Sequence, residues 1–168
     1  MKVLLASLTL FLLPGLCLGQ DSGKPADSAK EERDRRARES AFLRGEITFD
    51  DLKFDIEKDQ PFEREMLTER VESLHERTVQ IRGYILPATL FRETNIDEFV
   101  LVRDNQECCF GPGAALFDCV IVNLVNGVTT NFTTRPVTVK GKFRIKEFLY
   151  PDGSGHFAVF HLEGVSVK

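Results

Sequence analysis

Apolar and polar residues alternate along much of the chain after residue 78, and this pattern predicts strands. The clearest run is 137–146, and other runs cover 78–86, 99–102, 119–125 and 157–167. A period of two is typical of a strand that buries one face, whereas the nearly continuous apolar run 119–125 is typical of a strand buried on both faces. Turn residues separate the runs, and Asn126-Gly127 is the strongest turn pair.

Five strands within so short a stretch need to hide their edges, because open edges pair with other chains. The sequence therefore predicts a mainly β domain built as a small OB-like five-stranded barrel. Gly141, inside the fourth predicted strand, indicates a bulge or a corner of that barrel. A split sandwich or an open sheet packed on a helix is the alternative architecture.

One amphipathic helix is expected before the strands, at about residues 61–76. Pro61 suits an early helical position, and Leu67, Val71 and Leu74 recur at helical spacing. A partly alternating apolar segment at 47–56 is expected to lie against the domain. The single β-rich domain thus covers residues 47–168 and includes this helix.

The first 19 residues have the layout of a secretory signal peptide. A short basic start precedes the apolar run 3–13, and small residues stand three and one places before Gln20. A lipoprotein anchored through Cys17 is the alternative, but Leu16 occupies a place that favours a small residue. We therefore predict an exported chain, periplasmic or extracellular, without a transmembrane segment after cleavage.

Residues 20–46 form a charged linker. Nine of the ten residues at 30–39 are charged, with both signs present. Such a segment buries too little apolar surface to offset its ordering entropy, so we expect a disordered tether or a frayed, solvated helix.

The composition supports a globular core and opposes a nucleic-acid-binding surface. Of 168 residues, 42% are hydrophobic, and 14 Phe must fill much of the core because there are 2 Tyr and no Trp. The net charge of −4 opposes binding of nucleic acid by bulk charge. One face of the fourth predicted strand does carry four basic residues, Lys140, Lys142, Arg144 and Lys146. Because aromatic stacking partners are missing from this row, we interpret it as a solvated face and expect no nucleic-acid partner.

The candidate chemistry lies in a cysteine cluster between the second and third predicted strands. Cys108, Cys109 and Cys119 remain after signal cleavage, which is an odd number for an oxidising compartment. A structural disulfide from Cys119 to Cys108 or Cys109 is one hypothesis. A soft-metal site for Zn²⁺ or Cu(I), with His156 or His161 as a fourth ligand, is the second. A reactive thiol is the third.

Three motifs resemble a family of exported bacterial proteins of unknown function. They are Gly83-Tyr84-Ile85-Leu86-Pro87, the strand Phe99-Val100-Leu101-Val102, and Cys108-Cys109-Phe110-Gly111-Pro112 before an apolar strand. The resemblance covers roughly residues 47–168, and the ECCFGPGA loop is similar to a planctomycete branch. Proteobacterial relatives carry Cys-x-His at this loop, where Cys108 matches the cysteine and Phe110 replaces the histidine.

The resemblance implies no known enzyme activity. In its gene neighbourhood, the family is similar to partners of envelope metal-uptake transporters. We therefore expect a non-enzymatic, exported OB-like module that binds an envelope protein partner, a small ligand or a metal. In this hypothesis the cysteine cluster is a structural disulfide or a zinc or copper site. A thiol-dependent redox protein that uses Cys108 or Cys109 is the alternative function.

Overall fold

The computed structural model describes residues 25–57, 60–104, 115–153 and 155–168. Its strands are β1 (Glu46–Ile47), β2 (Thr78–Ile85), β3 (Glu98–Val102), β4 (Cys119–Leu124), β5 (Val137–Leu149) and β6 (His156–Val167). Its helices are α1 (Pro25–Leu43) and α2 (Glu69–Glu72), with 3₁₀ turns η1 (Phe49–Leu52), η2 (Arg64–Met66), η3 (Pro87–Thr89) and η5 (Leu116–Asp118). The chain divides into two compact units, Met1–Arg35 and Arg36–Lys168.

The strands form one sheet whose hydrogen bonding closes into a ring. Their order is β1-β2-β3-β4-β6-β5, and β2 also pairs with β5 through residues 78–83. The pairs β1–β2 and β4–β6 are parallel, and the other pairs are antiparallel. Each of the five longer strands has at least two neighbours, which leaves little open edge. The predicted mainly β fold and its five strands are confirmed, and β1 is an additional strand.

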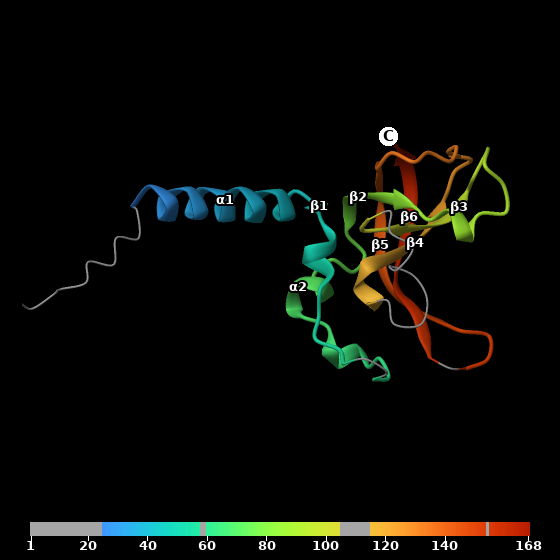
Figure 1. Cartoon of the computed structure of the whole chain (residues 1–168), viewed down its shortest axis with the longest axis horizontal. Helices are drawn as coiled ribbons and strands as arrows, with labels where there is room; N and C mark the ends of the chain where they lie inside the picture. Colours follow the sequence, from blue (N-terminus) through green and yellow to red (C-terminus); the bar gives the residue numbers. More distant parts are fainter. Residues whose placement is uncertain (1–24, 58–59, 105–114, 154) are drawn as a thin grey trace, which may run out of the picture. The chain divides into compact units, whose positions relative to one another are not determined.

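The β5–β6 hairpin, drawn in orange and red in Figure 1, reaches beyond the other strands. Two predicted local features appear in the structure, one in this hairpin and one in the turn after β4. Gly141 lies at a register shift between β5 and β6, so the predicted bulge is confirmed. In the turn after β4, Asn126 and Gly127 have φ values of 58° and 74°, as expected for an Asn-Gly pair.

The inner face of the sheet carries the main hydrophobic core. Phe99, Phe143 and Phe160 are its largest fully buried side chains. The ring centroids of Phe143 and Phe160 lie 5.4 Å apart, and Phe54 lies 6.2 Å from Phe160. Phenylalanine therefore fills much of the core, and the apolar segment 47–56 packs against it as predicted.

A second buried cluster lies on the outer face of the sheet. We call it the outer cluster and define it by Leu86, Val100, Val102, Cys119, Ile121 and Ala158, with Tyr84, Phe148 and Phe157 packed against it. Its members alternate along the chain with those of the inner core, as Val100 does between Phe99 and Leu101. β3 and β4 therefore bury both faces, which confirms the prediction for β4.

The helix expected over 61–76 is wrong in its extent. The chain is extended at Leu67 after η2, and α2 covers only Glu69–Glu72. Thr68 caps α2, because its hydroxyl accepts a hydrogen bond from the Val71 N–H at 3.3 Å. Leu67, Val71 and Leu74 are nevertheless buried in the core, so a turn-rich segment produces the apolar spacing that predicts a continuous helix.

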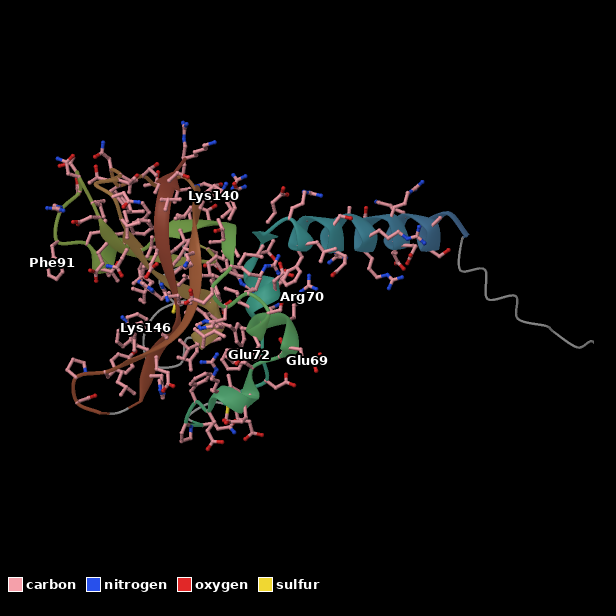
Figure 2. The ribbon with its side chains drawn as sticks, turned by 180° about the vertical axis from the view of Figure 1, so that it is seen from behind. Glu69, Arg70, Glu72, Phe91, Lys140 and Lys146 are labelled. Carbon is pink, nitrogen blue, oxygen red and sulfur yellow. The ribbon has the colours of Figure 1, made fainter. Side chains whose placement is uncertain are left out.

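Within the charged linker, Pro25–Leu43 forms the helix α1, whose sequence is polar on all sides. In the first unit, Arg35 donates to Glu32 one turn earlier at 3.0 Å. In the second unit, the guanidinium of Arg70 (Figure 2) lies 3.6 Å from the Phe42 ring centroid and pairs with Glu39 and Asp51. Among the described residues, no helix is long and apolar enough to cross a membrane.

Candidate functional site

A hollow of about 210 Å³ opens on the outer face of the sheet. Its lining combines Thr89 of η3, Glu98, Phe99 and Val100 of β3, Ile121 of β4, and Phe148 and Phe157 of the β5–β6 hairpin. Among these lining residues, Glu98 alone is charged. The hollow is therefore mostly apolar and carries one carboxylate.

A chain of polar side chains leads from the hollow across three strands. Asn123 Nδ2 donates a hydrogen bond to Glu98 Oε2 at 2.9 Å, and His161 Nε2 lies 2.8 Å from Asn123 Oδ1. A carboxylate only accepts hydrogen bonds, so Asn123 must present its nitrogen to Glu98 and its oxygen to His161. His161 therefore donates through Nε2–H, and its neutral ring carries the lone pair on Nδ1.

His161 is only 6% exposed, and Nδ1 has no hydrogen-bond partner within the described residues. Burial lowers the pKa of His161, and the positive charges of Lys146 and Arg144 lower it further, against the opposing effect of Glu163 and Glu98. The neutral imidazole is therefore favoured, which agrees with the tautomer assigned from Asn123. His161 supports the side chains beside the hollow and is not among its lining residues.

Aromatic rings gather on the hairpin beside the hollow. The Phe157 ring centroid lies 5.8 Å from that of Phe148 and 5.4 Å from that of Tyr150, and Phe148 lies 5.9 Å from the His161 ring. Lys146 Nζ lies 5.0 Å from the Phe148 ring centroid, within range of a cation–π interaction. These rings were not predicted from the sequence, because stacking partners were expected only within the basic row of β5. The available signal in the sequence was the position of Phe148, Tyr150 and Phe157 on the two sides of one turn.

Of the three clustered cysteines, only Cys119 lies within the described residues, and Cys108 and Cys109 lie outside them. Within the described residues Cys119 forms no disulfide, and it is buried in the outer cluster with Sγ 3.5 Å from the Phe157 carbonyl oxygen. Burial raises the pKa of this thiol to about 12, and the negative charge of Asp118 contributes to the rise. The thiol is therefore protonated at neutral pH, which makes it a poor nucleophile.

We expect iodoacetamide to leave Cys119 unmodified in the folded full chain at mildly alkaline pH and to modify it after denaturation. Alkylation requires an accessible thiolate, and burial together with the raised pKa removes it. Mass mapping of the peptide that contains Cys119 measures the modification. Labelling of the folded chain as rapid as that of the denatured chain would contradict the buried position.

His156, the predicted fourth metal ligand, contacts other groups. Its Nε2 lies 2.7 Å from Glu147 Oε2, and its ring centroid lies 5.4 Å from that of Phe62 in the inner core. Cys119 belongs to the outer cluster instead. Within the described ranges, no three His, Cys, Asp or Glu side chains gather closely enough to hold a metal ion. A metal site that includes Cys108 and Cys109 stays a prediction.

An ion pair closes the base of the cysteine loop. Arg103 Nε lies 2.8 Å from Asp118 Oδ1, and Arg103 also approaches Asp50 Oδ1 at 3.3 Å. The contact with Asp118 is short but is not aligned as a hydrogen bond, so its attraction is mainly electrostatic. The Arg103 N–H donates to the Asp118 carbonyl at 3.2 Å. Together these contacts hold the ends of the loop and position Cys119 at the start of β4.

The basic row on β5 is partly neutralised by acidic side chains. Arg144 Nε donates to Glu163 at 2.8 Å, and both Arg144 and Lys142 pair with Glu76. Lys140 and Lys146 lie at opposite ends of the row (Figure 2). This pairing fits a solvated face, and the absence of a nucleic-acid partner stays a prediction.

Comparison with known proteins identifies a family. The chain matches a family described as a protein of unknown function, DUF3299, over residues 23–167. It is similar to the crystal structure of a DUF3299 family protein from Pseudomonas aeruginosa PAO1, with a TM-score of 0.51 and 16% identity, covering 73% of this chain and 93% of that chain. At this identity the similarity shows a shared fold. No curated protein matched the chain. The chain belongs to the DUF3299 family.

Proposed function

We propose that this chain is a non-enzymatic binding module that takes its ligand on the outer face of β3 and β4. The hollow beside the outer cluster is the observation that supports this most. Ligand sites are typically concave and largely apolar, with a few polar groups that orient the ligand. The apolar lining and the single carboxylate of Glu98 have this composition.

The strand order supports the OB-like interpretation of the sheet as a five-stranded barrel, which is part of the proposal. β2, β3, β4, β6 and β5 follow one another round the ring, with the parallel pair between β4 and β6. OB folds bind ligands on the face of their second and third strands, beside the loops between strands 1–2 and 4–5. The equivalent parts here are β3, β4, the segment 86–97 and the β5–β6 hairpin, and each contributes to the hollow.

The polar groups of the hollow favour binding over catalysis. The Thr89 hydroxyl donates to the Leu86 carbonyl at 2.7 Å and accepts from the Val100 N–H at 3.4 Å, so backbone groups occupy it. Glu98 is an exposed carboxylate held at one oxygen by Asn123. Such a pair can orient a ligand, and it lacks the nucleophile activated by an adjacent base that covalent catalysis uses.

The proposal places the module in the cell envelope with a protein partner, which rests on the signal-peptide pattern of residues 1–19. In this proposal Cys119 has a structural role, because its thiol packs inside the outer cluster. The disulfide, the zinc or copper site and the redox alternative all depend on Cys108 and Cys109.

A screen of small fragments against the ¹⁵N-labelled full chain tests the binding face. We expect fragments that bind to shift the backbone amide resonances of Thr89, Val100, Ile121 and Phe157, which line the hollow. The amides of β2 at 78–81, where β2 pairs with β1 and β5, serve as the internal control and should not shift. Fragments that shift only resonances elsewhere, or a complete lack of binding fragments, would contradict the proposal.

A further inference from the structure

We infer that the hollow is a binding site for an arginine side chain of a partner protein. This inference rests on the proposed function and adds the chemistry of the ligand. It follows from three properties of the hollow, which are its isolated carboxylate, its aromatic rings and its size.

The carboxylate of Glu98 supplies the charge that a guanidinium requires. Glu98 forms no ion pair with a basic side chain in the described part of the chain, and its Oε2 is held by the neutral amide of Asn123. Asn123 is itself fixed by His161, so the carboxylate is oriented before a ligand arrives. Arginine binds carboxylates through a planar set of N–H donors, and such charge-assisted bonds are among the stronger hydrogen bonds in proteins.

Phe148 and Phe157 supply the aromatic surface. Their planes are tilted by 49° at a centroid distance of 5.8 Å, and both rings line the hollow. A guanidinium stacks on aromatic faces and carries only a weak hydration shell, so it loses little on entering such a site. Lys146 Nζ already lies 5.0 Å from the Phe148 ring centroid, a distance within the range of a cation–π interaction.

The size of the hollow limits the ligand to one side chain. Its volume of about 210 Å³ is below the range of roughly 300–1,000 Å³ that is typical of sites for drug-sized molecules. A single anchoring side chain in a pocket is a common arrangement at protein interfaces, and arginine is enriched among such anchors. The partner protein would contribute its remaining contacts outside the hollow.

Titration of the ¹⁵N-labelled full chain with N-acetyl-arginine methylamide tests the inference. N-acetyl-citrulline methylamide is the matched probe, because citrulline has nearly the same shape and no charge. We expect the arginine probe to shift the amides of Val100, Ile121 and Phe157 and to bind about tenfold more tightly than the citrulline probe, as the loss of a charge-assisted hydrogen bond predicts.

Variants assign the effect to the carboxylate and the rings. Glu98→Gln should weaken the arginine probe about tenfold and leave the citrulline probe unchanged, since glutamine still accepts the bond from Asn123. Phe148→Leu should also weaken the arginine probe. Glu93→Gln is the matched control, because it removes the same charge from a residue outside the lining, and it should have no effect.

The outcomes separate this inference from the proposed function. If the arginine and citrulline probes bind the hollow with equal affinity and Glu98→Gln changes neither affinity, the inference of an arginine site is wrong. The proposed binding face is then not contradicted. If a lysine probe binds more tightly than the arginine probe, the ligand is a different cation and the inference is also overturned. If neither these probes nor the fragments shift the hollow residues, both the inference and the proposed function fail.

Discussion

Replacing Gly141 with alanine should destabilise the folded chain by at least about 3 kcal/mol, a larger loss than most overpacked substitutions cause. A Cβ atom at Gly141 would lie 2.2 Å from the Glu163 carbonyl oxygen and 2.8 Å from Gly164 Cα. These are backbone atoms of β6 that pair with β5 at the bulge, so they cannot move without breaking the sheet. The substitution would therefore separate the two strands with the most extensive pairing.

Urea unfolding of the full chain, followed by circular dichroism, measures this loss as a lower midpoint at an unchanged slope. Gly153→Ala is the matched control. Gly153 has a φ of 73° but no atom within 4 Å of the added Cβ, so only backbone strain of roughly 1–2 kcal/mol is expected there. If Gly141→Ala cost no more than the control, β5 and β6 would not approach as closely as the structure describes.

Replacing Phe160 with alanine should cost about 3–5 kcal/mol, the usual range for a buried phenylalanine. Phe160 is fully buried on the inner face, where it packs on Phe143 and Phe54. Truncation removes the contacts with both rings, and it leaves a cavity that the paired strands around it cannot fill. Because domains are stable by only about 5–15 kcal/mol, the variant should unfold at a much lower urea concentration.

Phe91→Ala is the control for Phe160→Ala, since it removes the same side chain from the surface. Phe91 is fully exposed and stands apart from the other side chains in Figure 2, so we expect a change within about 0.5 kcal/mol. Equal effects of the two substitutions would mean that Phe160 does not lie in the core.

The candidate site differs from the site that the sequence predicts. The cysteine loop drew attention because Cys108, Cys109 and Cys119 are unusual residues close together in the sequence. Of these, only Cys119 lies within the described residues, and it is not among the described lining residues of the hollow, which come from η3, β3, β4 and the hairpin. Common residues such as Val100 and Phe157 carry no motif, so sequence spacing could not single them out.

The local features of the fold were determined by the sequence itself. Strand periodicity, the Asn126-Gly127 turn and the bulge at Gly141 depend on neighbouring residues, and all of them appear in the structure. The helical spacing at 61–76 predicted a continuous helix, which is wrong. Such spacing indicates only which residues are buried, and a segment in which a new helix begins after Thr68 buries the same residues.

The tertiary structure alone decided how the strands close and what the outer face carries. The pairing of β2 with β5 and of β4 with β6 joins residues that are far apart in the sequence. The pairing of β4 with both β3 and β6 brings Glu98, Asn123 and His161 into one hydrogen-bonded chain from three strands. Such contacts depend on register between distant segments, which is set by the packing of the whole core and leaves no local pattern in any one strand.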